Sequence, residues 1–97
     1  MVTESQFRTK VLQKLRKLGG VWLVMTANRF SASGRSDIIG LYKRHFIAIE
    51  LKRPGKTDAY YSVTPLQQAF LKEVEAEGGI SILARDWETI EKRLSLI

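Results

Sequence analysis

Three segments place apolar residues three or four positions apart, which is the spacing of a helix that covers a core. The first begins with Thr3-Glu4-Ser5-Gln6, which has the form of a capping box, and ends at Gly19-Gly20. The second begins with a similar box, Thr64-Pro65-Leu66-Gln67, and ends at Gly78-Gly79. The third follows Asp86, a favoured N-cap residue. The apolar positions of the three predicted helices are Phe7, Val11, Leu12, Leu15 and Leu18; Leu66, Phe70, Leu71 and Val74; and Trp87, Ile90 and Leu94.

Four shorter segments are rich in strand-forming residues. Residues 21–25 are continuously apolar, which predicts a buried strand, and Trp22 is assigned with Trp87 to the core. Residues 37–42 and 46–52 flank the turn Lys43-Arg44-His45 and predict a hairpin. Residues 80–84 form the fourth predicted strand. The order αβββαβα indicates a small α/β fold, with a central mixed sheet flanked by helices in one domain, residues 1–97.

Composition narrows the class of protein. A chain of 97 residues and 11.1 kDa suits one domain. Because it has no cysteine, disulfide scaffolds, thiol nucleophiles and zinc–thiolate sites are excluded. We expect an intracellular, cytoplasmic protein, since no apolar run is long enough for a membrane span and the N-terminus lacks the pattern of a signal peptide.

Positive charge is concentrated in the first half of the chain. The formal net charge is +6, and residues 1–56 carry twelve Lys and Arg residues against three acids. A basic half of this kind favours a polyanionic partner, most commonly nucleic acid, although a solvated basic surface is the alternative.

The three acids of the basic half fall at special positions in the predicted elements. Because side chains alternate along a strand, Glu50 and Lys52 share one face, and the hairpin pairs Asp37 with the neighbourhood of Glu50. Glu4 precedes Phe7 by three residues and so faces the sheet. Two carboxylates beside an ammonium suit Mg²⁺, which prefers oxygen ligands. The cation and the lysine would then offset the charge of a scissile phosphate.

Each of these residues also has a structural explanation. Glu4 can interact with the helix dipole or with Arg8. A Glu-x-Lys pair is common on the polar face of a strand, and Asp37 suits a turn after Gly34-Arg35-Ser36. The capping box accounts for Gln67. Each residue taken alone is common in such a position, but the presence of all of them in one short chain is much less common.

In this order the residues resemble the PD-(D/E)-x-K nuclease superfamily, and within it the virus-type replication-repair nuclease (VRR-NUC) domain. The resemblance covers nearly the whole chain. Ser36 stands where the family usually has proline, at a position that shapes the turn rather than binding metal. The matching residues are Glu4, Gly34-Arg35-Ser36-Asp37, Glu50-Leu51-Lys52, Pro54-Gly55 and Thr64-x-x-Gln67-x-x-Phe70.

The resemblance implies a Mg²⁺- or Mn²⁺-dependent endonuclease. It implies that Asp37, Glu50, the Leu51 carbonyl and Glu4 bind the metal, that Lys52 is the catalytic lysine, and that Gln67 positions the water or the acid cluster. Stand-alone members resemble Holliday junction resolvases, act as homodimers on branched DNA, and are typical of phages and prophages.

Basic and aromatic residues of the loops are candidate DNA contacts. Tyr60 and Tyr61 could stack on bases, or pack in the loop or at a dimer contact. Two other classes stay open, a non-catalytic nucleic-acid-binding module and an interaction module of a phage replication complex. The enzyme is favoured because all five predicted catalytic residues are present, namely Glu4, Asp37, Glu50, Lys52 and Gln67. The candidate phosphate contacts, expected in loops or turns near the acidic residues, are Arg29, Arg35, Lys43, Arg44, Arg53 and Lys56.

Overall fold

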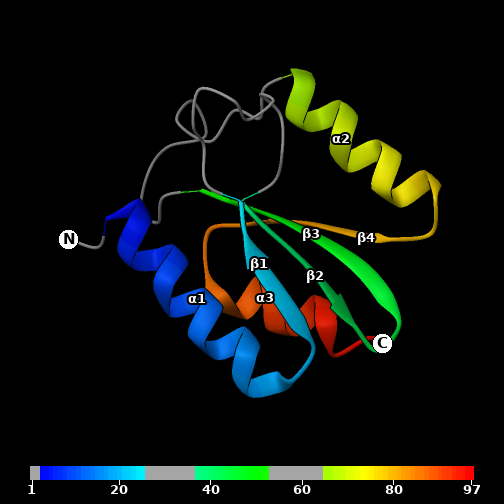
Figure 1. The fold of residues 1–97 in the computed structure, drawn as a ribbon. Coiled ribbons are helices and arrows are strands. Elements are labelled where there is room, and N and C mark those ends of the chain that lie inside the picture. Colours follow the sequence, from blue (N-terminus) through cyan, green and yellow to red (C-terminus); the bar gives the residue numbers. More distant parts are fainter. Residues whose placement is uncertain (1–2, 26–36, 53–64) are drawn as a thin grey trace.

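The computed structural model describes residues 3–25, 37–52 and 65–97, with the exception of the Glu4 side chain. Its helices and strands follow the predicted order αβββαβα and confirm the α/β fold (Figure 1). None of the helices in these three ranges is long and apolar enough to cross a membrane. The elements are α1 (Glu4–Leu18), β1 (Val21–Val24), β2 (Ile38–Tyr42), β3 (His45–Leu51), α2 (Pro65–Ala76), β4 (Ile80–Ala84) and α3 (Trp87–Leu94).

The four strands form one mixed sheet in the order β1-β2-β3-β4. The first three are antiparallel, and β4 runs parallel to β3. Lys43 and Arg44 form a two-residue turn between β2 and β3, both with positive φ (49° and 70°), as tight hairpin turns require. The predicted three-residue turn is therefore wrong by one residue, because His45 pairs with Tyr42 and already belongs to β3.

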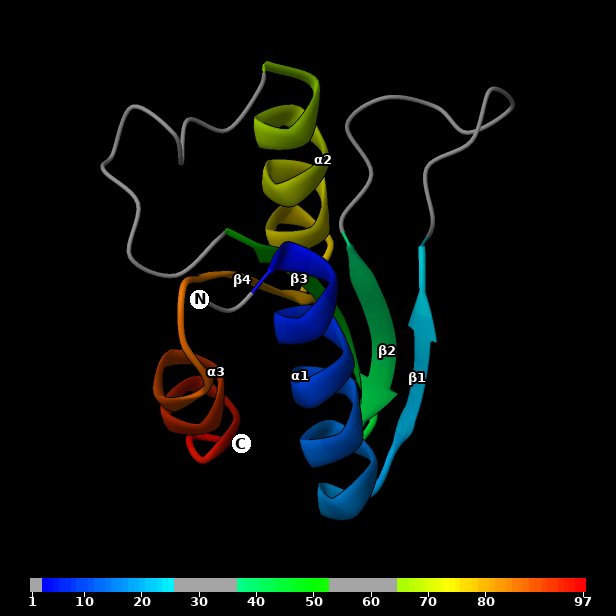
Figure 2. The same cartoon turned by 90° about the vertical axis from the view of Figure 1, so that its left-hand side faces the viewer.

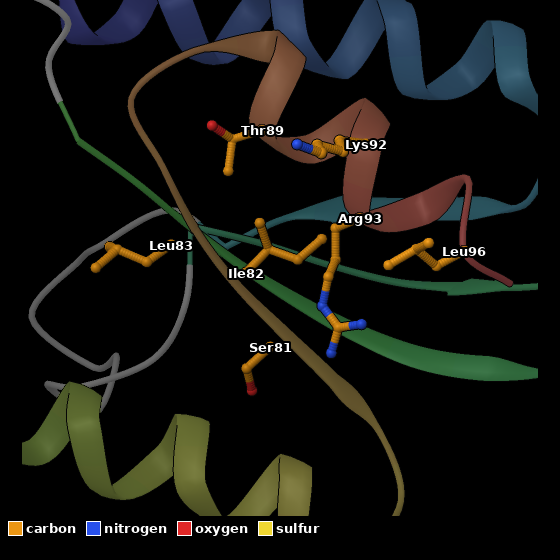
Figure 3. Close-up of a pocket in the computed structure, with 7 residues that line it drawn as sticks. All are labelled: Ser81, Ile82, Leu83, Thr89, Lys92, Arg93 and Leu96. Carbon is orange, nitrogen blue, oxygen red and sulfur yellow. The ribbon is translucent and has the colours of Figure 1, made fainter.

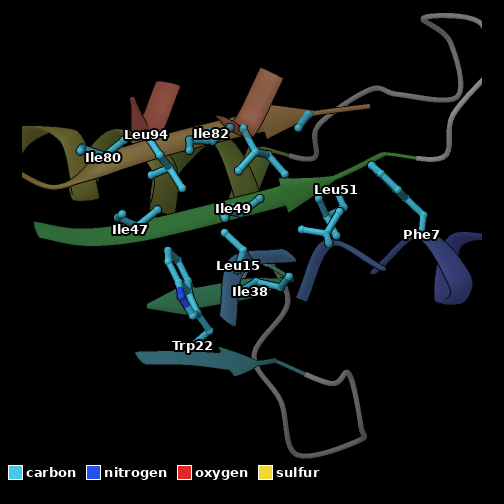
Figure 4. Packing of buried hydrophobic residues seen from close by; sticks show 13 residues of the cluster. Phe7, Leu15, Trp22, Ile38, Ile47, Ile49, Leu51, Ile80, Ile82 and Leu94 are labelled. Carbon is cyan, nitrogen blue, oxygen red and sulfur yellow. The ribbon is translucent and has the colours of Figure 1, made fainter. Parts of the chain in front are cut away.

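One face of the sheet forms the core. Trp22, Gly40, Ile47 and Ile80 lie side by side across the four strands on this face. Helices α1 and α3 cover it, and their buried side chains meet those of the strands (Figures 2 and 4). The core consists of Phe7, Val11, Leu15, Trp22, Ile38, Ile47, Ile49, Leu51, Ile80, Ile82, Ala84, Ile90 and Leu94, and the partly buried Trp87 packs against it.

The prediction that residues 21–25 form a buried strand is wrong. In the described sheet β1 is an edge strand and ends at Val24. Its side chains alternate: Trp22 is buried, whereas Val21 and Leu23 are 62% and 58% exposed. Continuous apolar character does not distinguish an edge strand from a central one, because only sheet order decides which face is covered.

Helix starts follow the predicted capping chemistry where the structure describes them. The Gln6 N–H donates to Thr3 Oγ1 (3.1 Å) and the Thr3 N–H donates to Gln6 Oε1 (2.9 Å), which completes the first capping box. Asp86 Oδ1 accepts from the Thr89 N–H (2.8 Å) at the start of α3. Thr64 lies outside the described residues, so the second capping box stays a prediction.

Two residues of the predicted apolar stripes lie at the surface. Leu18, in the last turn of α1, and Leu66, in the first turn of α2, are both exposed. Helical spacing predicts which side of a helix faces a core, but it does not predict how far along the helix the core extends.

Helix α2 covers part of the opposite face of the sheet (Figure 2). It contacts β3 and β4, where Val74 is buried and Ser81 Oγ donates to the Leu71 carbonyl (2.7 Å). The Ser81 N–H also donates to Glu75 Oε1 (2.8 Å). These contacts fix the helix on β3 and β4, and a hydrogen bond from Gln67 to Glu50 places its first turn near the carboxyl end of β3.

We expect Gly40→Ala to destabilise the fold by about 3 kcal/mol, because the new methyl group would overlap the Trp22 ring and lie 2.6 Å from the Val21 carbonyl oxygen. Gly78→Ala is the control, since its Cβ would meet no atom within 4 Å and only its positive φ (+91°) costs energy, about 1 kcal/mol. Urea unfolding measures both. An equal or smaller loss in Gly40→Ala would contradict the packing of Trp22 on β2.

Candidate active site

The register of the hairpin brings Asp37 and Glu50 together. Ile38 pairs with Ile49 in an antiparallel ladder. Asp37, which precedes Ile38, therefore lies opposite Glu50, which follows Ile49. The Met25 N–H donates to the Asp37 carbonyl (2.7 Å), which extends the pairing of β1 and β2 to this level. The predicted convergence of the two carboxylates is therefore what the strand pairing produces.

A backbone amide holds the Asp37 side chain in place. Its Oδ2 accepts from the Leu51 N–H at 2.7 Å. The N–H and C=O of one strand residue point toward the same neighbouring strand. The Leu51 carbonyl therefore points, like the Leu51 N–H, toward Asp37. This contact is not visible in the sequence, since any residue except proline at position 51 would supply the same N–H.

Glu50 points away from the core. Its neighbours Ile49 and Leu51 pack into the core (Figure 4), so the alternation of the strand directs Glu50 and Lys52 to the face of the sheet on which α2 lies. Glu50 is only 4% exposed. Gln67 Nε2 donates to Glu50 Oε1 (2.9 Å), and Lys52 Nζ lies 3.5 Å from the same oxygen.

The second carboxylate oxygen of Glu50 is buried without a donor. Within the described residues, Oε2 has no hydrogen-bond partner. A buried carboxylate oxygen without a partner costs free energy, and native structures rarely leave one unexplained. A cation is one ligand that would satisfy such an oxygen.

Burial raises the pKa of Glu50 from 4.5 to about 7. The negative charge of Asp37 adds to the increase, because two nearby carboxylates resist ionising together. The charge of Lys52 lowers the pKa in part. Positive charge placed beside Glu50 would favour its ionised form.

The donor set fits a hard divalent cation. Asp37 and Glu50 offer carboxylate oxygens, the orphaned Oε2 is one of them, and the Leu51 carbonyl faces the side of Asp37. The described residues contain no group of three or more acids, histidines or cysteines arranged to hold a metal. The Glu4 side chain is not among them, so its predicted part in the site stays a prediction.

Gln67 has a second role besides the predicted capping box. Its amide reaches from the first turn of α2 to Glu50, which links the helix to the acidic cluster. The sequence resemblance had implied a position for Gln67 near the acids, and the hydrogen bond confirms that position. The capping alternative is not excluded, because Thr64 lies outside the described residues.

Two of the candidate DNA contacts do not lie where they were expected. Lys43 and Arg44 form the turn at the far end of the hairpin from Asp37, so the expectation that they lie near the acidic residues is wrong. Lys43 Nζ donates to the Ile97 carbonyl (3.1 Å) and lies 5.4 Å from the centroid of the Tyr42 ring. Their contact with DNA stays a prediction. The other candidates, outside the described residues, are Arg29, Arg35, Arg53, Lys56, Tyr60 and Tyr61.

Comparison with models of known protein families, with curated proteins and with solved structures finds no match for the chain. The geometry of the acidic cluster and the resemblance of its residue pattern are the two features that point to a function.

We expect Glu50→Gln to stabilise the metal-free protein at high pH. Because folding raises the pKa of this carboxyl, the free energy of unfolding of the wild type falls as the pH rises from 4.5 through about 7. The stability gained by Glu50→Gln relative to the wild type should therefore grow by about 3 kcal/mol between pH 4.5 and pH 8.5. Urea unfolding in the presence of a chelator measures it. Glu73→Gln, on the exposed surface of α2, controls for the loss of one negative charge. A gain that is the same at both pH values would contradict the raised pKa.

Proposed function

We propose that the protein is a Mg²⁺- or Mn²⁺-dependent endodeoxyribonuclease that hydrolyses phosphodiester bonds of branched DNA. The observation that carries this proposal is the meeting of Asp37 and Glu50 beside Lys52, with one Glu50 oxygen buried and lacking a donor among the described residues. The resemblance to VRR-NUC nucleases, which rests on the same residues, supplies the substrate class.

Four groups would hold the cation. They are the carboxylates of Asp37 and Glu50, the carbonyl of Leu51 and, as the resemblance implies, the carboxylate of Glu4 at the start of α1. When bound, a divalent cation offsets the charge of the scissile phosphate and lowers the pKa of a coordinated water. A bound cation would also offset the raised pKa of Glu50, since it would stabilise the ionised form.

Lys52 is the residue that faces the reacting phosphate in this proposal. Its ammonium lies 3.5 Å from Glu50 Oε1 and its side chain is mostly buried, so its charge is poorly screened by water. Hydrolysis joins a water oxygen to phosphorus, breaks one P–O ester bond and leaves a proton for the departing oxygen. An ammonium fixed at this point orients the water and stabilises the additional negative charge that develops at phosphorus.

Asp37 and Gln67 support this arrangement in different ways. The Leu51 N–H fixes one oxygen of Asp37, and the Gln67 amide fixes Oε1 of Glu50. With one oxygen of each acid held by a neutral donor, the two carboxylates keep their orientation when a cation binds. Little reorganisation is then needed at the moment of reaction, which is how a preorganised site lowers a barrier.

A non-catalytic DNA-binding module on the same fold is the alternative. Such a module needs positive charge, which the chain has, but it has no use for two carboxylates that repel phosphate. The cost of burying Glu50 next to Asp37 favours a site that uses them. Cation binding and DNA cleavage separate the two functions.

We expect Mg²⁺ or Mn²⁺ to raise the melting temperature of the wild type at pH 8 by about 5 °C at ten times the dissociation constant. Asp37→Asn keeps an acceptor for the Leu51 N–H but removes a charged ligand, so the shift should disappear. Glu73→Gln should keep the wild-type shift. Thermal unfolding with and without the cation measures all three. A wild type that does not respond, or an equal shift in Asp37→Asn, would overturn the metal site.

We expect Lys52→Ala to slow cleavage of branched DNA at least about 100-fold, with normal folding and an unchanged Mg²⁺ shift, because the ammonium stabilises charge that develops only during the reaction. Lys72→Ala, an exposed lysine of α2, is the matched control and should cleave like the wild type. The assay compares four-way, flap and linear duplex DNA. Undiminished cleavage by Lys52→Ala would eliminate this role, and a preference for linear duplex would eliminate the branched substrate while keeping the chemistry.

A further inference from the structure

In the described sheet, β4 is the edge strand on the side away from β1. The direction of its backbone groups follows from one contact, in which the Lys52 N–H donates to the Ala84 carbonyl (2.9 Å). In a parallel ladder, residues that point toward the neighbouring strand alternate with residues that point away from it. Ile82 therefore also points toward β3, whereas Ser81 and Leu83 direct their N–H and C=O groups outward. Outward groups of this kind form an edge to which another strand can be added.

A hollow of about 410 Å³ follows this edge and is lined by residues of β4 and α3 (Figure 3). Its volume lies within the roughly 300–1,000 Å³ range of ligand sites. Its lining includes two exposed leucines, Leu83 and Leu96, and two basic residues, Lys92 and Arg93. None of the described residues that line it is acidic. The hollow therefore combines apolar surface with positive charge beside the outward backbone groups.

The contacts of Glu75 show which chemistry this edge accepts. Its Oε1 accepts from the outward Ser81 N–H (2.8 Å) and lies 3.7 Å from the Arg93 guanidinium, which extends from α3 toward Ser81 (Figure 3). The carboxylate oxygen thus occupies the place that a carbonyl oxygen of an added strand would take at this N–H. Because the Glu75 and Arg93 side chains are both largely exposed, their ion pair contributes little stability and an incoming acceptor can replace it.

The two faces of an added strand would meet different chemistry. Ser81 Oγ donates to the Leu71 carbonyl of α2, so Ser81 and Leu83 direct their side chains to the α2 face of the sheet. Leu83 is exposed there and favours an apolar neighbour. Ile82 packs into the core on the other face, toward α3, where Lys92 favours an acidic neighbour. An added strand that alternates apolar and acidic residues would satisfy both faces.

We propose that the outer edge of β4 binds an extended segment of another protein in which apolar and acidic residues alternate. Hydrogen bonds to the backbone of Ser81 and Leu83 supply affinity, and Lys92 and Arg93 select acidic side chains. Leu83 pairs with Glu50, so the bound segment would lie two strand spacings, about 10 Å, from the acidic cluster. The segment would therefore hold its protein beside the cluster without entering it. The proposal does not rest on the proposed nuclease activity.

Two other occupants fit these observations less well. The phosphates of a nucleic acid would pair with Lys92 and Arg93, but phosphates only accept hydrogen bonds and would leave the outward carbonyls without donors. A second copy of the chain joined at this edge would bring both sets of these basic residues together, in a chain whose net charge is already +6.

Fluorescence anisotropy tests the proposal. The probe is a fluorescein-labelled peptide of alternating valine and glutamate, titrated at about 0.15 M salt with a chelator and without DNA. We expect a dissociation constant on the order of 10–100 µM. Lys92→Glu should weaken binding by about tenfold or more, because it reverses a charge at the contact. Lys10→Glu makes the same change on the exposed surface of α1 and should bind like the wild type.

Removal of Glu75 tests the edge itself. Glu75→Ala frees the Ser81 N–H and Arg93, so it should tighten binding of the same peptide by about fivefold. Glu73→Ala removes the same charge from an exposed position of α2 and should not tighten it. Lys92 and Lys10 are both exposed, so their variants test the site even if Glu75→Ala loosens the packing of α2.

N-methylated peptides test whether the segment binds as a strand. Methylation of the valine nitrogens blocks an antiparallel added strand, and methylation of the glutamate nitrogens blocks a parallel one, so one of these two peptides should fail to bind. Amide exchange followed by NMR then locates the bound peptide. We expect exchange of the Leu83 N–H to slow in the complex, because this outward N–H gains an acceptor.

A wild type that does not bind the acidic peptide, or equal binding by Lys92→Glu, would overturn the proposal. So would binding of both methylated peptides, equal effects of Glu75→Ala and Glu73→Ala, or a Leu83 N–H that is protected by a DNA oligonucleotide or by raised protein concentration instead of by the peptide. These outcomes are distinct from failure of the nuclease proposal. A protein that binds the peptide but neither binds Mg²⁺ nor cleaves DNA would overturn the proposed function alone.

Discussion

The register of the β2–β3 hairpin is the constraint on which the rest of the site depends. The tight turn at Lys43 and Arg44 sets Ile38 opposite Ile49, and this pairing sets Asp37 opposite Glu50. A shift of the β3 register by one residue would turn the Glu50 side chain into the core and a core isoleucine onto the opposite face of the sheet. Burial of alternate residues in the core therefore fixes the position of the two acids, and the same interaction that stabilises the fold assembles the cluster.

The two faces of the sheet have different roles. On one face, α1 and α3 complete a continuous apolar core that stabilises the fold. On the other, α2 packs on β3 and β4 and brings Gln67 to Glu50, while Val21, Leu23 and Leu41 of β1 and β2 are exposed. One side thus combines a costly pair of carboxylates with an open apolar surface. Exposed apolar surface and buried carboxylates both reduce the stability of a fold, and both are common at binding or catalytic sites.

Local sequence patterns predict which side chains form the acidic cluster better than they predict how the rest of the sheet is arranged around it. Alternation along one strand and a tight turn were enough to predict that Asp37, Glu50 and Lys52 converge. The exposed character of β1 was missed because sheet order depends on contacts between distant parts of the chain. The expected position of Lys43 and Arg44 near the acids is wrong because a hairpin separates its turn from its open end by the length of its strands.

The most direct test of this account is an NMR titration of the Glu50 side-chain carboxyl in the metal-free protein, in the wild type and in Asp37→Asn. The account predicts a pKa of about 7 in the wild type and a lower value in Asp37→Asn, where the neighbouring charge is absent. Saturating Mg²⁺ should also lower the wild-type pKa. A pKa near 4.5 that responds neither to Asp37→Asn nor to Mg²⁺ would contradict the coupled acidic cluster.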